Sequence, residues 1–242
     1  MDAFLTDKQR AVRRSVRDFC QREIVPVARE LDQEARFPWD VVEKMAALGY
    51  FGIQVPRELG GAGLDSVSYV IAIEEISRAS AGLGLCATVH NSVAVYPITA
   101  FGSREQIERW VPPLARGEKI GAFCLTEPNA GSDAGGIEAT ALADGDDYVV
   151  NANKVFVTNG GVADICLIFA RTDPKAGHRG ISVIVAERGA TGFVVGDLEF
   201  TLGGKTHSLK TGEHIHFNSD IPHKLKSLSN RPTRCLVILY TL

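Results

Sequence analysis

The spacing of apolar positions changes once along the chain, close to Gly121, and this change predicts the fold class. Before it, apolar residues such as Leu5, Val12, Val16 and Phe19 recur every three or four positions, which is typical of amphipathic helices. After it, apolar and polar residues alternate, which is typical of half-buried strands. Helices therefore come first and strands follow, so the predicted class is α+β rather than an alternating α/β fold.

Polar and small residues mark the expected helix ends. Residues 6–9 and 103–106 each fit a capping box, in which a Thr or Ser side chain and a Gln three positions later satisfy the first backbone amides. Gly49 fits a helix C-terminal cap. A long helical region is expected over about 66–100, and Pro112-Pro113 is expected to close the helix that follows Ser103.

The second part of the chain is predicted to be an antiparallel β-barrel. Asp144-Gly145 and Asn159-Gly160-Gly161 supply its turns. The expected strands are IGAFCLT, DDYVVNANKVFVTN, ADICLIFART, GISVIVAE and GFVV.

Composition excludes several classes of protein. The 242 residues are 45% hydrophobic, which is ordinary for a globular chain, and the net charge of -3 without a basic stripe argues against nucleic-acid binding. No run of 18 apolar residues predicts a membrane span, and the N-terminus lacks the apolar stretch of a secretory signal. Five widely spaced cysteines indicate buried free thiols in a reducing compartment, so a cytoplasmic location is expected.

GLGLCA, at residues 82–87, matches the loose form of a dinucleotide-binding fingerprint. That fingerprint needs a strand before it and a helix after it. The preceding SYVIAIEEISRAS is predicted to be helical, so close helix packing through small residues is the better interpretation.

Two segments, FCLTEPNAGSD (residues 123–133) and KVFVTNG (154–160), form a candidate ligand site. Each is interpreted as a strand that ends near a threonine, Thr126 or Thr158. Phe156 is placed to stack on a planar ligand whose edge the two hydroxyls bind, and Ser132 and loop amides suit a phosphate. The alternative is an ordinary pair of sheet ends, the first closed by a β-turn at Pro128-Asn129.

These segments resemble the acyl-CoA dehydrogenase family when they are taken with others in the same order. The resemblance covers roughly residues 1–193. It rests on REIVPVARELD, VPRELGGAGLD, VYPITAFGSREQIERWVPPLARGEKIGAFCLTEPNAGSDAGGIEATA and NANKVFVTNGGVADICLIFART.

The resemblance implies an FAD cofactor, an acyl-CoA substrate and an electron-transfer flavoprotein as electron acceptor. The implied reaction removes the α-proton of the thioester and passes the β-hydride to flavin. Ser132 would also lie near the acyl-CoA, and Phe156 stands where relatives often have tryptophan. The residues implied to surround FAD are Phe123, Cys124, Leu125, Thr126, Ser132, Phe156, Val157 and Thr158.

The catalytic base of that family is a glutamate in a C-terminal helical domain, which also completes the FAD site and builds the tetramer. No segment after about Gly192 shows the pattern of that domain, and none of Glu74, Glu75 and Glu127 is assigned as the base. We therefore expect impaired turnover. The alternative is a non-catalytic fusion or truncated protein that acts as a binding module and associates with itself or a partner through a sheet edge.

The last segment resembles the second half of a cupin domain, in GDLEFTLGG, TGEHIHFNSDIPHKLKSLSN and CLVILYT. No metal site is expected, because the partners of a His223 ligand have no counterpart and His214 and His216 fit a strand surface. A rival account has this tail complete the β-barrel. The expected domains are residues 1–118 (helical), 119–193 (β-barrel) and 194–242 (cupin-like).

Overall fold

The computed structural model describes residues 4–34, 36–145, 147–190, 193, 198–202, 205–209 and 223–227. The chain divides into two compact units, Met1–Gly121 and Ala122–Leu242. The first unit is helical and the second is β-rich, which confirms the predicted order of secondary structure.

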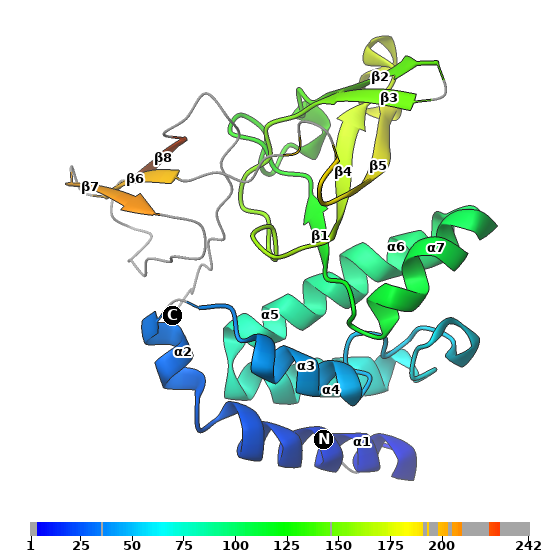
Figure 1. The fold of residues 1–242 in the computed structure, drawn as a ribbon, viewed down its shortest axis with the longest axis vertical. Helices are drawn as coiled ribbons and strands as arrows, with labels where there is room; N and C mark the ends of the chain where they lie inside the picture. Colours follow the sequence, from blue (N-terminus) through cyan, green and yellow to red (C-terminus); the bar gives the residue numbers. More distant parts are fainter. Residues whose placement is uncertain are drawn as a thin grey trace. The chain divides into compact units, whose positions relative to one another are not determined.

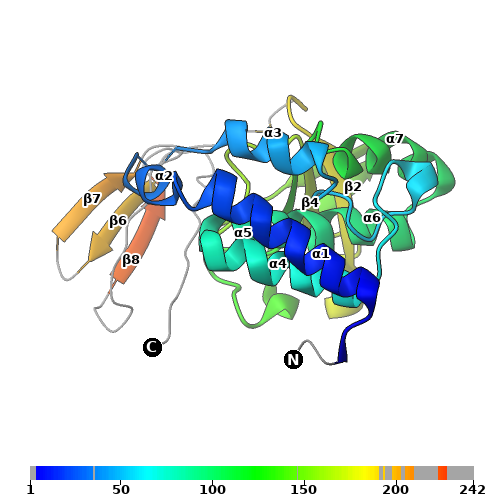
Figure 2. The same cartoon turned by 90° about the horizontal axis from the view of Figure 1, so that it is seen from below.

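Helices build the first unit, and Figures 1 and 2 both place α1 beside α4. The α-helices are α1 (Asp7–Phe19), α2 (Ala28–Glu34), α3 (Trp39–Ala47), α4 (Ser66–Ala79), α5 (Ala81–Val89), α6 (Tyr96–Phe101) and α7 (Arg104–Ala115). Short π-helical turns lie at Cys20–Ile24 and His90–Val95, and a 3-10 turn lies at Arg57–Leu59.

The predicted helix caps are confirmed. The hydroxyls of Thr6 and Ser103 each accept a hydrogen bond from the backbone of the glutamine three residues later, and each glutamine side chain accepts one in return. Gly49 follows α3 with φ of 76°, the left-handed conformation that a helix C-terminus favours in glycine.

One prediction about helices is confirmed and one needs correction. The region over about 66–100 is helical, as predicted, with a break at Ser80, which is extended between α4 and α5 and caps α5 with its hydroxyl. Pro112 and Pro113 do not end α7, which continues to Ala115.

An ion pair between a half-exposed arginine and a buried glutamate joins α1 to α4. Glu75 is 4% exposed, and its carboxylate accepts hydrogen bonds from Nε (2.9 Å) and Nη2 (2.7 Å) of Arg17. This bonding to Arg17 lowers the pKa of Glu75. The carboxylate therefore has a structural role, in agreement with the expectation that Glu75 is no catalytic base.

The β-rich unit contains two sheets. The larger has the order β1-β4-β2-β3, with β5 also paired to β4, and the smaller has the order β7-β6-β8 (Figure 1). The strands of the larger sheet are β1 (Gly121–Cys124), β2 (Thr140–Asp144), β3 (Asp147–Asn151), β4 (Ile165–Arg171) and β5 (Ile181–Glu187). Those of the smaller sheet are β6 (Leu198–Leu202), β7 (Lys205–Leu209) and β8 (His223–Ser227), of which the backbone alone is described.

The larger sheet is not wholly antiparallel, which corrects the prediction. β2 pairs with β3, and β4 with β5, in antiparallel register, but Thr140 and Arg171 pair β2 with β4 in parallel. Arg171 holds this contact: its backbone amide donates to Ala139 (2.8 Å) and its guanidinium donates to the Ile137 carbonyl (2.7 Å).

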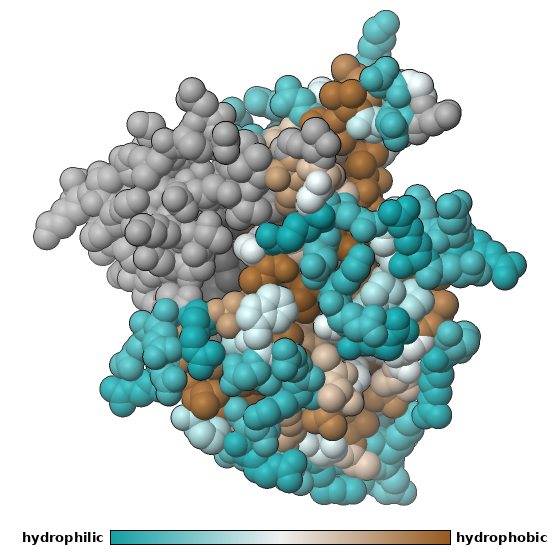
Figure 3. All heavy atoms as spheres, in the orientation of Figure 1, coloured by the Kyte–Doolittle hydropathy of each residue, from teal (hydrophilic) through white to brown (hydrophobic). Residues whose placement is uncertain are grey.

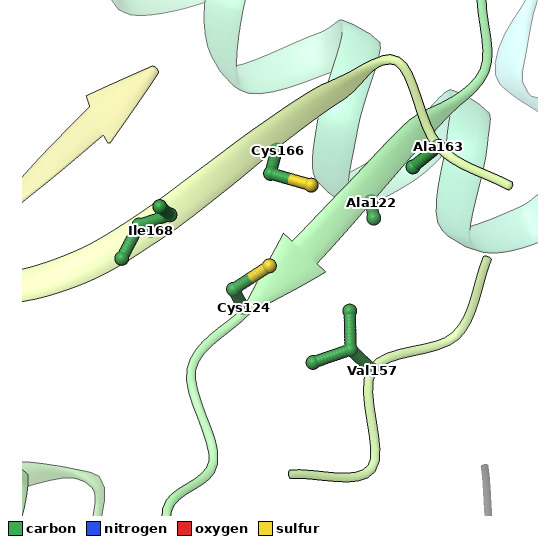
Figure 4. Close-up of a cluster of buried hydrophobic side chains, with 6 residues drawn as sticks. All are labelled: Ala122, Cys124, Val157, Ala163, Cys166 and Ile168. Carbon is green, nitrogen blue, oxygen red and sulfur yellow. The ribbon is translucent and has the colours of Figure 1, made fainter. Parts of the chain in front are cut away.

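Small and sulfur-containing side chains fill the core of the larger sheet. Figure 4 shows this cluster, in which Cys124 of β1 and Cys166 of β4 pack with Val157. Cys20, Cys86, Cys124 and Cys166 are buried free thiols, as predicted, and burial raises the pKa of Cys20 to about 11. Cys235 lies outside the described residues.

Apolar side chains also occur on the outer face of the larger sheet. Leu142 and Val149 are cross-strand partners in β2 and β3 and are 52% and 59% exposed. Figure 3 shows this apolar surface over the strands of the sheet. None of the helices in the described part of the chain combines the length and apolar character that crossing a bilayer requires.

Candidate functional site

The loop of the first candidate segment begins where β1 ends, at Cys124. Cys124 is fully buried, whereas Leu125 and Thr126 are partly exposed as the chain leaves the sheet. The backbones of Glu127 and Ala130 then exchange two hydrogen bonds, of 3.0 and 3.2 Å, so Pro128 and Asn129 form the tip of a tight turn. The interpretation of Pro128-Asn129 as a β-turn is confirmed, and the turn leaves residues 131–133 exposed.

The second candidate segment is not a strand, which corrects the sequence prediction. β3 ends at Asn151 and β4 begins at Ile165, so residues 154–160 form a loop. Phe156 has φ of 57° and Asn159 has φ of 63°, both in the left-handed region that L-residues rarely adopt. A left-handed residue such as Phe156 interrupts the regular alternation of side chains that a strand requires.

The two segments nevertheless lie side by side. The backbone amide of Val155 donates a 2.9 Å hydrogen bond to the carbonyl of Thr126. Val157 is 4% exposed and packs in the same core cluster as Cys124 (Figure 4). The structure therefore brings together Thr126 and the segment that carries Phe156 and Thr158.

A buried ion pair, formed by one residue from each segment, joins the two segments. The ammonium of Lys154 lies 2.6 Å from Oε1 of Glu127 and donates a second hydrogen bond, of 2.9 Å, to the carbonyl of Leu125. The other bonds to the Glu127 carboxylate come from the backbone amides of Glu138 and Ala139. Burial lowers the pKa of Lys154, and its hydrogen bond to Glu127 acts in the opposite direction.

Sequence reasoning missed the role of this pair. Glu127 and Lys154 stand 27 positions apart, and nothing in their local patterns links them. The available signal was a charged residue close to the apolar residues of each segment, Glu127 in one and Lys154 in the other, because a buried charge needs a partner.

The eight residues that the sequence singled out differ in what they present at the surface. The side chains of Cys124 and Val157 point into the core, so only their backbones are available to a ligand. Phe123 packs edge-on against Phe169, with ring centroids 4.7 Å apart. Phe156 is 38% exposed, Ser132 is exposed, and Thr126 and Thr158 are partly exposed.

The unpaired polar groups fit a ligand with hydrogen-bonding edges. Among the residues that the structure describes, the hydroxyls of Thr126, Ser132 and Thr158 have no hydrogen-bond partner in the chain. A Cβ built on Gly131 would meet no atom within 4 Å, so the loop backbone is open to approach. The site therefore offers two threonine hydroxyls, loop amides and one exposed aromatic ring, a set that suits a planar heteroaromatic ring with a phosphate.

No group of three or more His, Cys, Asp or Glu side chains placed for a metal ion occurs in the described part of the chain. His214 and His216 lie outside that part. His223 lies in β8, where only the backbone is described.

Comparisons with known proteins agree with the order of the two units. Residues 6–118 match the acyl-CoA dehydrogenase N-terminal domain, and residues 122–218 match the acyl-CoA dehydrogenase middle domain. The second match includes residues 194–218, so it favours the account in which this part of the tail continues the middle domain.

Three similar proteins represent the relatives. The short-chain specific acyl-CoA dehydrogenase of Clostridium acetobutylicum is 46% identical over 208 residues, which are 86% of this chain and 55% of that protein. A chain in a solved structure that concerns the electron transferring flavoprotein of Acidaminococcus fermentans has a TM-score of 0.77 and 37% identity, over 84% of this chain and 52% of that chain. The glutaryl-CoA dehydrogenase of Mycobacterium smegmatis in complex with FADH2 has a TM-score of 0.74 and 31% identity, over 84% of this chain and 49% of that chain.

The chain thus spans about half the length of the proteins it matches. The two domain matches follow each other in the family's order and together reach from residue 6 to residue 218. The chain belongs to the acyl-CoA dehydrogenase family, of which it carries the N-terminal and middle domains.

Proposed function

We propose that this chain is the flavin-binding part of an FAD-dependent acyl-CoA dehydrogenase that acts on a short-chain acyl-CoA. The observation that carries the proposal is the hydrogen bond between residues 123–133 and residues 154–160, which brings Thr126 next to the segment that carries the exposed Phe156 ring and Thr158. The relative that is complexed with FADH2 supports the cofactor. The relative that is short-chain specific supports the substrate class.

Each residue of the site has a proposed role toward FAD. The backbones of Phe123, Cys124 and Leu125 and the Thr126 hydroxyl would meet the flavin ring on one side. Phe156, the Val157 backbone and Thr158 would meet it on the other side. Ser132 would bind the cofactor and lie near the acyl-CoA.

FAD, when bound, supplies the hydride acceptor for the β-carbon of the acyl-CoA, and an electron-transfer flavoprotein is the proposed electron acceptor. A solved structure that contains a similar chain concerns an electron transferring flavoprotein, which supports that choice of partner. Removal of the α-proton needs a base. Glu127 is held by Lys154, and Glu75 by Arg17, so neither carboxylate is placed for that step.

The visible absorption spectrum of the purified 242-residue chain tests this proposal. We expect the bands of a bound flavin after incubation with FAD, and no bleaching when a four-carbon acyl-CoA is added without oxygen, because the family's base comes from its C-terminal domain. A folded chain that takes up no flavin would contradict the cofactor assignment. Bleaching would show that a base lies within the 242 residues and would overturn the assignment of the base.

Matched threonine variants test the site itself. Thr126→Val and Thr158→Val each remove one proposed hydrogen bond to the cofactor while they keep the shape of the side chain. We expect each to weaken FAD binding about tenfold. Thr140→Val, in β2, is the control and should bind FAD as the unmodified chain does.

A further inference from the structure

The most deeply buried charged pair of the β-rich unit, as far as it is described, lies directly below the candidate site. The side chains of Lys154 and Glu127 are 3% and 5% exposed. Burying two charges seldom stabilises a fold more than an apolar pair of the same size would. What such a pair does provide is a fixed geometry, because each remaining hydrogen bond is directional.

The bonds of this pair reach three separate parts of the chain. Lys154, which follows β3, donates to the carbonyl of Leu125, which follows β1. Glu127 accepts from the amides of Glu138 and Ala139, immediately before β2. The pair therefore fixes the end of β1, the start of β2 and the end of β3 relative to one another.

Phe156 depends on this fixed geometry. Its φ of 57° is unfavourable for an aromatic residue and persists only where the neighbouring residues enforce it. On one side, Lys154 is bonded to Glu127 and the Val155 amide is bonded to Thr126. On the other side, Val157 is packed in the core. The residues on both sides of Phe156 are thus held in place, and the ring of Phe156 is left exposed between them.

We propose that Glu127 and Lys154 are positioning residues for the flavin site, which hold Thr126 and Phe156 in the relative placement that the flavin ring requires. The inference rests on the proposed function. Both side chains are buried, so neither is assigned a contact with the cofactor. Supporting side chains of this kind determine how accurately the groups that meet a ligand are placed.

The test uses the full 242-residue chain as the wild type and in three variants. Lys154→Met removes the ammonium and leaves a buried carboxylate unpaired, so this variant can fail to fold. The double variant Glu127→Gln/Lys154→Met removes both charges, so it leaves no unpaired buried charge. It can therefore be measured even if Lys154→Met does not fold. Glu75→Gln is the matched control, because Glu75 is an equally buried partner of an arginine in the helical unit.

The first measurement is amide hydrogen exchange without flavin, read by mass spectrometry on peptides that cover residues 123–139 and 152–160. We expect exchange in both segments of the double variant to be about tenfold faster or more, while β4 and β5 exchange as before. Glu75→Gln should leave both segments unchanged. Wild-type protection of both segments in the double variant would overturn the inference.

The second measurement is the dissociation constant of FAD. We expect the double variant to bind FAD about tenfold more weakly or worse, and Glu75→Gln to bind it normally. Equal FAD affinity of the double variant and the wild type would overturn the inference and leave the proposed function intact. A wild-type chain that binds no FAD would overturn the proposed function, while the exchange data would still decide whether the pair couples the two segments.

Discussion

We expect His90→Ala to lower the free energy of unfolding by about 4 kcal/mol. His90 is fully buried, and its ring bonds two backbone groups that lie 24 and 31 positions away from it in the sequence. The Gly121 amide donates a 3.1 Å hydrogen bond to Nδ1, and Nε2 lies 3.0 Å from the carbonyl of Leu114. Truncation would leave both backbone groups without this partner and open a cavity beside Phe51, whose ring packs edge-on against the imidazole.

The bonding fixes the charge state of His90. Because a backbone amide can only donate, Nδ1 must accept, so the proton is on Nε2 and the ring is neutral. Burial lowers the pKa of His90 from 6.5 to about 4. Protonation would place a charge in the core and remove the acceptor of the Gly121 amide.

The pH dependence follows from the sign of this shift. The folded pKa lies below the unfolded one, so the unfolded state binds more protons between them and stability falls as the pH falls. The contribution of His90 is complete above pH 6.5 and is lost toward pH 4, by about 3 kcal/mol. The difference in stability between the wild type and His90→Ala should therefore shrink over this range.

Chemical unfolding of both proteins at several pH values measures this difference. His178→Ala is the control: His178 is exposed, so this change should alter stability by less than about 0.5 kcal/mol. The role given to the ring would be contradicted if His90→Ala lowered the free energy of unfolding by less than about 1 kcal/mol. It would also be contradicted if the difference in this free energy between the wild type and His90→Ala did not change with pH.

The helical unit was predictable because its signals are local. The capping boxes at Thr6 and Ser103 and the glycine cap at Gly49 each need only a few consecutive residues, and all three are present in the structure. The break at Ser80 was harder to foresee, since a serine inside a helical pattern is tolerated and here becomes a cap because the chain turns.

The candidate site was predictable only in part, because its geometry depends on long-range contacts. The sequence placed Thr126 and Phe156 in one site, and the bond from Val155 to Thr126 brings their segments together. It did not predict the left-handed Phe156, since phenylalanine is common in strands and no local rule favours that conformation for it. Nor did it pair Glu127 with Lys154, which only the fold brings together.

Substitution of alanine at two glycines of one helix should change stability in opposite directions, and the larger change is at Gly84. A Cβ at Gly84 would lie 2.0 Å from Oγ and 2.8 Å from Cα of Ser77 in α4. The hydroxyl can rotate away but the backbone of α4 cannot, so α5 must move outward. We expect Gly84→Ala to lower the free energy of unfolding by about 2 kcal/mol or more, despite the better helix propensity of alanine.

Gly82, which lies in the same helix but does not approach α4 closely, is the matched control. A Cβ there has its nearest neighbour, Oγ of Ser80, at 4.0 Å, and the residue is exposed. Gly82→Ala should stabilise the protein by up to about 1 kcal/mol, because alanine restricts the unfolded chain and favours the helix. Thermal unfolding of the two variants compares them directly. Equal effects of the same sign would contradict a close approach of α4 and α5 at Gly84, and opposite signs would confirm that GLGLCA packs α5 closely against α4 at this position.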